Sequence, residues 1–192
     1  MRADADLAIA ETRAWVQRAV VGLNLCPFAK APWVKGQVRF RVCETDDPRV
    51  LLDALCEEMN ALVRADPAVL ETTLLIHPNV LQAFDDFNDF LEAADAALDE
   101  LGLEGVLQIA SFHPRYRFEG TEPDDLSNAT NRSPYPTLHL LREASVERAV
   151  AAFPEAEAIF EANIATLEAL GAQGWSELQA QCRADAALSR TP

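Results

Sequence analysis

Glycine is scarce in this chain, with 7 residues in 192, and the familiar glycine-rich site motifs are missing. The sequence contains no GxGxxG, no GxxxxGKS/T, no GxSxG and no EF-hand loop. Such motifs hold phosphate groups, expose a nucleophilic serine or bind calcium. Their absence argues against a nucleotide-fold dehydrogenase, a P-loop enzyme and an α/β-hydrolase.

Cysteine is also sparse, and Cys26, Cys43, Cys56 and Cys182 are far apart without a CxxC pair. This spacing does not favour a structural zinc cluster. No stretch reaches the roughly 18 apolar residues of a membrane helix, and residues 1–11 do not resemble a signal peptide. We therefore expect a cytoplasmic protein with four reduced thiols.

Positively charged residues are few: the sequence has 16 lysines and arginines and 31 aspartates and glutamates, which gives a net charge of −15. We expect no binding to nucleic acid or to a membrane surface from such a chain. The segment from Arg13 to Cys43 nevertheless contains no acid, and its basic residues are Arg13, Arg18, Lys30, Lys35, Arg39 and Arg41. This basic segment fits either a small anionic ligand or internal pairing with acidic helices.

The length and the hydrophobic share of 49% indicate one globular domain with a core at about residues 5–178. Periodic apolar residues predict five helical segments. The first spans residues 7–25, the second begins after the cap residue Asp47, and the third ends near Gly102. The fourth begins after the cap residue Ser145, and the fifth ends near Gly171. Asn79 is a candidate cap for the helix that ends near Gly102, and Pro154 is expected to interrupt the helical region after Ser145. Strands are predicted at 38–43, 72–76, 106–111 and 137–141.

This element order predicts an α/β fold, a single-domain sandwich with a four-stranded, mixed, mainly parallel sheet packed by helices, plus C-terminal helices. Two successive strand–helix–strand connections favour parallel pairing of the first three strands. Ligands of such sheets tend to bind beyond the carboxyl ends of the parallel strands. His77 and His113 each follow such an end.

The segment 112–136 between the last two strands shows neither helical nor strand periodicity. So long a loop in a compact domain is usually functional or disordered. Phe112, Tyr116, Phe118 and Tyr135 are able to anchor it, and its prolines reduce the entropy cost of ordering it. We predict an ordered functional loop, with a structural cover of the sheet as the alternative.

We expect the three histidines, His77, His113 and His139, to lie near this loop. His113 or His139 is a candidate acid or base. If their strands were neighbours, the three imidazoles would suit Zn²⁺ or another borderline metal, although no HxH, HxxxH or HExxH motif supports this. A hydrogen-bonded structural histidine is the alternative for each.

Arg132 is the leading candidate for an anion clamp, because guanidinium groups bind carboxylate and phosphate through two hydrogen bonds. Salt bridges to Asp124, Asp125 or Glu143 are the competing explanation. The candidate ligand-binding residues are Arg132, Asn128, Asn131, Arg39, Arg41, Lys30 and Tyr135.

Cys26 is a candidate nucleophile because it lies in the acid-free segment, where Lys30 would lower its pKa. The preceding helix C-terminus would raise that pKa instead. A buried inert thiol is the alternative.

Two segments resemble the hallmarks of a bacterial family catalogued as domain of unknown function 1415. The first is Gly22-Leu23-Asn24-Leu25-Cys26-Pro27-Phe28-Ala29. The second runs from Phe112-His113-Pro114-Arg115-Tyr116-Arg117-Phe118 through 128–136 to Leu138-His139-Leu140-Leu141-Arg142-Glu143. The resemblance covers roughly residues 7–178 and implies a bacterial, stand-alone protein, but no activity and no residue role.

The favoured hypothesis is a small-molecule enzyme that acts on an anionic substrate, with histidine as acid or base and arginine as the anion-binding group. A non-catalytic module that binds a metabolite or a metal is the first alternative. An interaction subunit that works through its acidic helices is the second. The residues point to no particular cofactor or oligomeric state.

Overall fold

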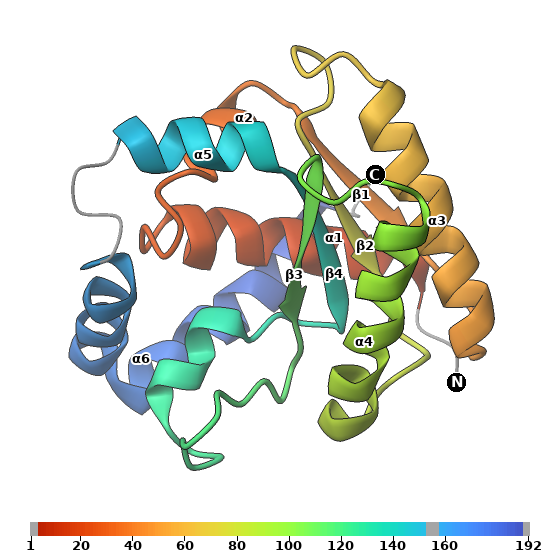
Figure 1. The fold of residues 1–192 in the computed structure, drawn as a ribbon. Coiled ribbons are helices and arrows are strands. Elements are labelled where there is room, and N and C mark those ends of the chain that lie inside the picture. Colours follow the sequence, from red (N-terminus) through yellow and green to blue (C-terminus); the bar gives the residue numbers. More distant parts are fainter. Residues whose placement is uncertain (1–3, 153–157, 190–192) are drawn as a thin grey trace.

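A computed structural model describes residues 4–152 and 158–189, and its centre is one four-stranded sheet (Figure 1). The strand order is β1-β2-β4-β3. Strand β1 pairs with β2 in parallel, whereas β4 is antiparallel to both of its neighbours. The bounds are Val38–Val42 for β1, Thr72–Ile76 for β2, Leu107–Phe112 for β3 and Thr137–Arg142 for β4.

The predicted mixed, four-stranded sheet is confirmed, but the expected parallel pairing holds only for β1 and β2. Strand β4 lies between β2 and β3, so these two strands do not pair. Because both are antiparallel to β4, β2 and β3 still run in the same direction. The long loop after β3 lets the chain return antiparallel to it, without a crossover helix.

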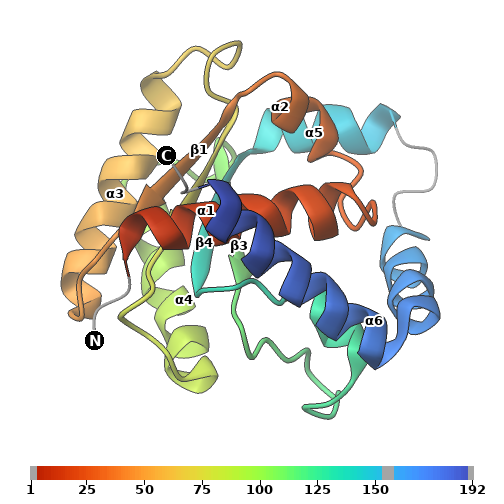
Figure 2. The same ribbon diagram turned by 180° about the vertical axis from the view of Figure 1, so that it is seen from behind.

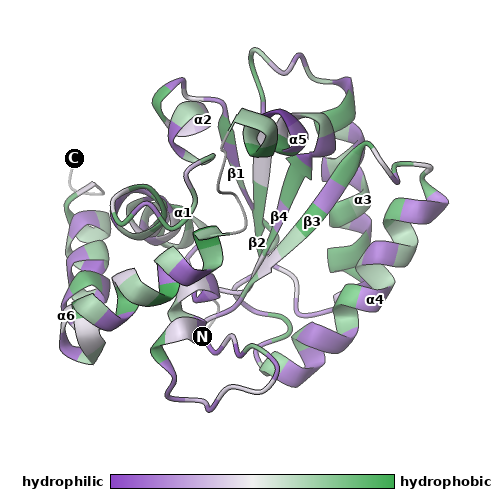
Figure 3. Cartoon of the chain, turned by 60° about the vertical axis from the view of Figure 1, so that its left-hand side comes forward, coloured by the Kyte–Doolittle hydropathy of each residue, from purple (hydrophilic) through white to green (hydrophobic). Residues whose placement is uncertain are grey.

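Helices cover both faces of the sheet (Figures 2 and 3). One face carries α1 (Ala5–Trp15), which continues as a π-helical turn, η1 (Val16–Val21), and α6 (Ile159–Ser189). The other face carries α3 (Pro48–Arg64) and α4 (Phe84–Glu100). The remaining elements are α2 (Lys30–Val34), the 3-10 helix η2 (Leu126–Asn131) and α5 (Glu143–Ala152).

The alternation of side chains along the central strands builds two cores. Leu75, Leu138 and Leu140 belong to the core between the sheet and α3 and α4. Leu74 belongs to the core between the sheet and α1, η1 and α6. Because neighbouring residues of a strand point to opposite faces, one apolar strand fills both layers.

The helix boundaries agree in part with the sequence predictions. Asp47 caps α3, since its Oδ1 accepts the backbone N–H of Arg49 at 2.9 Å. Asn79 does not cap α4, which begins at Phe84; its side chain instead donates to the carbonyl of Glu44 at 3.3 Å. The predicted cap Ser145 lies inside α5, because this helix follows β4 directly.

Gly171 divides α6 into two helical segments, as its position at the end of an apolar stripe predicted. Its φ of 71° and ψ of 169° lie outside the helical region, in a conformation that is accessible mainly to glycine. The predicted break at Pro154 lies outside the described residues. Within the described ranges, no helix has both the length and the apolar character needed to cross a membrane.

Candidate functional site

The loop 112–136 leaves the end of β3 at the sheet edge where β1, β2 and β3 all end. Asn128 holds the loop together from inside, and its side chain is buried. Its Oδ1 accepts the N–H of Phe118 at 2.9 Å and the hydroxyl of Thr121 at 2.8 Å, while its Nδ2 donates to the carbonyl of Glu122 at 2.8 Å. Asn128 therefore organises the loop backbone.

Arg132 also binds the loop itself. Its Nε donates to the carbonyl of Tyr116 at 3.2 Å, and its Nη2 donates to the carbonyl of Pro123 at 2.5 Å. Burial lowers the pKa of Arg132, and the charges of Asp124 and Asp125 oppose this effect. Its Nη1 has no hydrogen-bond partner in the described residues, so part of the guanidinium group is available to a ligand.

Tyr135 connects the loop to α1. Its hydroxyl donates to Oε2 of Glu11 at 2.6 Å, across 124 positions of sequence. Burial raises the pKa of Tyr135, and the hydrogen bond to Glu11 raises it further, so the phenol stays protonated. Asn131 fixes the other end of the loop, where its Nδ2 donates to the carbonyl of Ser111 at 3.1 Å and its own carbonyl accepts the N–H of His113 at 3.1 Å.

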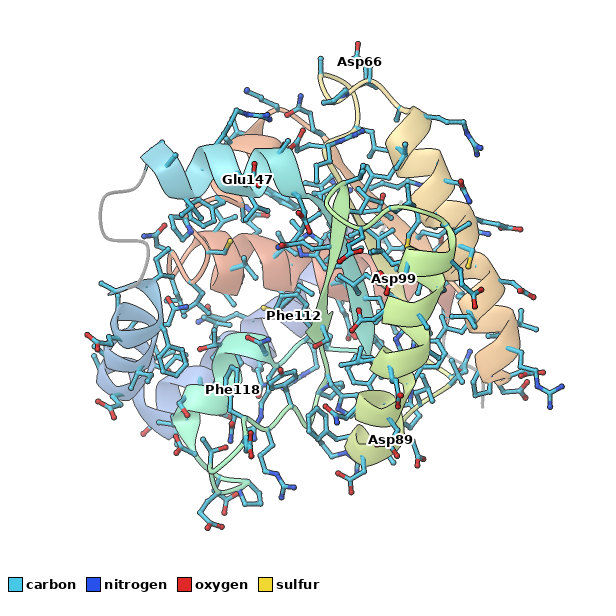
Figure 4. All side chains as sticks on the ribbon, viewed as in Figure 1. Asp66, Asp89, Asp99, Phe112, Phe118 and Glu147 are labelled. Atoms are coloured by element: carbon cyan, nitrogen blue, oxygen red, sulfur yellow. The ribbon has the colours of Figure 1, made fainter. Side chains whose placement is uncertain are left out.

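Aromatic rings anchor the loop on both sides, as the sequence predicted. Phe112 meets Trp15 of α1 edge to face, with 5.3 Å between ring centroids. The ring centroids of Tyr116 and Phe118 are 5.0 Å apart, and those of Phe118 and Phe160 of α6 are 6.0 Å apart. Figure 4 shows Phe112 at the end of β3 and Phe118 farther along the loop.

A cavity of about 240 Å³, here called the loop cavity, lies between this loop, α1 and the second segment of α6. The loop, α1 and α6 each contribute both polar and apolar groups to its wall. The lining residues include Glu11, Trp15, Arg132, Tyr135, Trp175, Leu178, Gln179, Cys182 and Arg183.

Two groups of the wall lack partners in the part of the chain that the structure describes. Trp15 is 4% exposed, and its buried indole Nε1–H has no hydrogen-bond partner in the described residues. An unpaired buried donor costs free energy, which a ligand acceptor would recover. Arg183 is exposed and forms no ion pair within residues 4–152 and 158–189. Both groups favour an anionic or hydrogen-bond-accepting ligand.

The three histidines do not converge, so the geometric condition for a three-histidine metal site is not met. His77 stacks on Phe87 of α4 and His113 lies tilted against the same ring, with centroid distances of 5.6 and 5.2 Å. His139 lies on the opposite face of the sheet, where its Nε2 is 2.7 Å from the hydroxyl of Thr72. The described residues contain no group of three potential metal ligands.

Burial keeps the imidazoles neutral. It lowers the pKa of His77 and of His139 to about 4, and it also lowers the pKa of His113. His113 accepts the N–H of Arg115 at Nδ1 at 3.0 Å, and its Nε2 is 3.3 Å from the carbonyl of Leu81. His77 is fully buried, and its Nε2 has no partner in the described residues. None of the three lines the loop cavity.

Much of the basic segment is paired internally. Arg39 and Arg41 both approach Oε1 of the buried Glu58, at 3.0 and 3.6 Å, on the α3 face of the sheet. Arg18 forms a two-point ion pair with Asp185 of α6, at 2.5 and 2.9 Å. These contacts match the internal-pairing interpretation, and they place Arg39 and Arg41 away from Arg132. Lys30 is exposed at the start of α2, outside the loop cavity.

Cys26 also lies outside the loop cavity. Burial raises the pKa of its thiol, and the backbone N–H groups of Phe28 and Ala29 oppose this effect only in part. The neighbouring residues have structural roles. Asn24 adopts a φ of 55°, and the carbonyl of Leu25 accepts Nδ2 of Asn163 from α6 at 2.8 Å. This motif therefore shapes the end of η1 and its contact with α6.

Sequence reasoning missed the helical wall of the cavity. Glu11 and Trp15 are four residues apart on α1, and Trp175, Gln179 and Arg183 repeat at the same interval on α6. That interval places each set on one side of its helix. The pattern is readable in the sequence, but it does not reveal which loop the two helix faces meet.

Comparison with known proteins supports the resemblance carried by the two motif segments. A family model described as "Protein of unknown function (DUF1415)" matches residues 7–177. No curated protein and no solved structure gives a significant match. The match spans all elements of the sheet, the loop 112–136 and the start of the second segment of α6.

Proposed function

The chain belongs to the DUF1415 family of proteins of unknown function, and because this description assigns no activity, we propose a function from the geometry alone. The proposed function is reversible binding of a small anionic molecule in the loop cavity. The residues proposed to hold it are Arg183, Arg132 and Trp15.

The observation that carries the proposal is the set of unpaired donors around one cavity. Arg183 has no carboxylate partner in the described part of the chain, and Nη1 of Arg132 has no hydrogen-bond acceptor there. The N–H of Trp15 is buried without an acceptor. A carboxylate would accept from all three kinds of donor, and hydrogen bonds to charged groups contribute about 1.5–3 kcal/mol each.

The size of the cavity limits the ligand. A dry cavity of roughly 150 Å³ holds a benzene ring, whereas pockets for drug-sized ligands span about 300–1,000 Å³. At about 240 Å³, the loop cavity fits one ring or a branched aliphatic chain with a charged group. A dinucleotide or a coenzyme A derivative is too large for it.

The proposed function is ligand binding, in which no histidine acts as acid or base, because neither His113 nor His139 lines the loop cavity. The predicted enzymatic activity would require another proton carrier at this site. We propose a cytoplasmic location as well, on the ground that all four cysteines are free thiols.

The test is a titration with small carboxylates, followed by tryptophan fluorescence and calorimetry. Trp15 and Trp175 both line the cavity, so a bound ligand should change their emission. We expect 3-phenylpropanoate to bind the unmodified protein. Arg183→Ala should weaken binding about tenfold or more, which corresponds to about 1.4 kcal/mol.

The matched control is Arg49→Ala, which removes an exposed arginine from α3 on the other side of the sheet. Its affinity should equal that of the unmodified protein, because it changes the net charge by the same amount without touching the cavity. Equal weakening by both substitutions would mean that only the overall charge matters. No binding of any small carboxylate would overturn the proposed function.

A further inference from the structure

The loop cavity contains charges of both signs, which a purely anionic ligand would not require. Glu11 of α1 lines it together with Arg132 and Arg183. Its Oε2 accepts the Tyr135 hydroxyl at 2.6 Å. Its Oε1 has no hydrogen-bond partner in the described residues. A carboxylate has about four acceptor positions, so Glu11 retains capacity for a cationic donor.

The opposite charges of the cavity do not neutralise each other. No ion pair within 4.0 Å joins Glu11 to Arg132 or to Arg183 in the described ranges. The same two helical regions do form such a pair nearby, where Arg18 binds Asp185 through two contacts of 2.5 and 2.9 Å. The separation of Glu11 from the arginines leaves room for a ligand that carries both charges.

The rest of the wall is apolar. Trp15, Trp175 and Leu178 contribute two indole rings and a branched aliphatic side chain. Removing a hydrocarbon group from water against such surfaces is favourable by about 25 cal/mol per Å². A ligand that fills the cavity therefore needs an apolar body beside its two charges.

From these three features we infer that the loop cavity binds a zwitterionic α-amino acid with an apolar side chain. This inference rests on the proposed function and names its ligand class. The ligand carboxylate lies against Arg183 and Arg132, and it accepts the Trp15 N–H. The ligand ammonium group donates to Glu11. The side chain packs on Trp175 and Leu178.

The experiment compares matched ligands by calorimetry and tryptophan fluorescence. L-leucine and L-phenylalanine are each titrated beside the acid that lacks the amino group and the amine that lacks the carboxyl group. For the phenyl series these are 3-phenylpropanoate and 2-phenylethylamine. We expect at least one amino acid to bind tenfold or more tightly than its deaminated acid, and the amine to bind most weakly.

Two variants test which residue binds the ammonium group of the ligand and which binds its carboxylate. Glu11→Gln keeps an acceptor for Tyr135, so it should preserve folding while removing the preference for the amino acid over the deaminated acid. Affinity for the deaminated acid should stay within about twofold. Arg183→Ala should weaken the binding of the amino acid and of the deaminated acid by a similar factor. Thermal denaturation of each variant checks that the fold is retained.

The possible failures are distinguishable. If deaminated acids bind as tightly as the amino acids, or if Glu11→Gln leaves the ratio unchanged, the inference is wrong while the proposed anion binding stands. If neither amino acids nor their deaminated acids bind, both are wrong. If the amines bind more tightly than the amino acids, Glu11 dominates the cavity and the assignment of the arginines to a carboxylate is overturned.

Discussion

Single buried polar residues decide whether the loop 112–136 has a fixed shape. Asn128 satisfies two donors and one acceptor of the loop, so its loss leaves buried groups unpaired. The sequence identified Asn128, Asn131, Arg132 and Tyr135 as candidate ligand-binding groups, and in the structure each of them also forms a hydrogen bond within the protein. Composition shows that hydrogen-bonding groups are present. It does not show whether their partners are backbone atoms or a ligand, because that depends on the path of the loop.

We predict that Asn128→Ala lowers the free energy of unfolding by about 2–3 kcal/mol, since it leaves the Phe118 N–H and the Glu122 carbonyl without their partner. Urea denaturation measures the change. Asn88→Ala on the exposed side of α4 is the control, and it should stay within about 0.5 kcal/mol. An equal effect of both substitutions would show that the network in the loop does not contribute to stability.

His77 should make stability depend on pH in the acidic range. Burial lowers its pKa from about 6.5 to about 4, so the unfolded chain takes up a proton at a higher pH than the folded chain does. The contribution of His77 to the free energy of unfolding is constant above pH 6.5 and is lost as the pH falls towards 4. At pH 4 the loss is on the order of 3 kcal/mol.

The check is a series of urea denaturation curves between pH 7 and pH 4. His77→Asn removes the titrating group and keeps a donor near the carbonyl of Val80, which His77 Nδ1 approaches at 3.2 Å. This variant should have a flatter pH dependence, whatever its stability at pH 7. The same slope in both proteins would contradict the assignment, because His139 and His113 would then account for the whole effect.

At the scale of elements, the sequence predicted every strand within one residue, because alternation and apolar runs are local signals. The predicted helix over 7–25 covers η1 but not its π-helical form, and the sequence predicted neither α2 nor that α4 begins only at Phe84. Leu81 has a φ of 55°, so the chain turns after the His77-Pro78-Asn79 segment before the helix starts. Apolar periodicity continues through this turn, and therefore it did not reveal the break.

The end of η1 needs glycine at position 22. A Cβ atom there would lie far inside van der Waals contact of the Arg18 carbonyl oxygen, which is backbone and has little freedom to move. We predict that Gly22→Ala destabilises the fold by about 2 kcal/mol or more and shifts the Leu25 contact with Asn163. Denaturation midpoints measure this effect.

Gly174→Ala is the matched substitution, because the new Cβ would meet only the side chain of Leu170. This side chain is flexible, and alanine favours the helix by about 1 kcal/mol over glycine. We therefore expect a small change of either sign. A Gly22→Ala protein as stable as the Gly174→Ala protein would show that η1 adapts to the added methyl group.

At the scale of the whole molecule, the sequence predicted that the loop leaves the sheet edge where β1, β2 and β3 end, because the element order gave these strands one direction. It did not predict that α1 and the second segment of α6 form the other walls. The two helices are separated by more than 140 positions, and their meeting results from packing on one sheet face. Long-range packing of this kind leaves no local pattern.

Helix α4 carries seven acidic residues and no basic residue. Every acidic side chain of α4 is exposed, and Asp89 and Asp99 are marked on its outer surface in Figure 4. None forms an ion pair with a residue of the described ranges. With a net charge of −15, repulsion between such groups should oppose the compact state.

Salt should therefore stabilise this protein. At 0.3 M NaCl the charges of α4 are screened over less than 10 Å, and we expect a gain of about 1 kcal/mol over 10 mM NaCl, or roughly 2–4 °C in Tm. The triple variant Asp89→Asn, Asp95→Asn, Asp99→Asn should be more stable at low salt and respond less to NaCl. A Tm that falls with salt would mean that the ion pairs Arg18–Asp185 and Arg39–Glu58, the second of which includes a buried carboxylate, outweigh the repulsion.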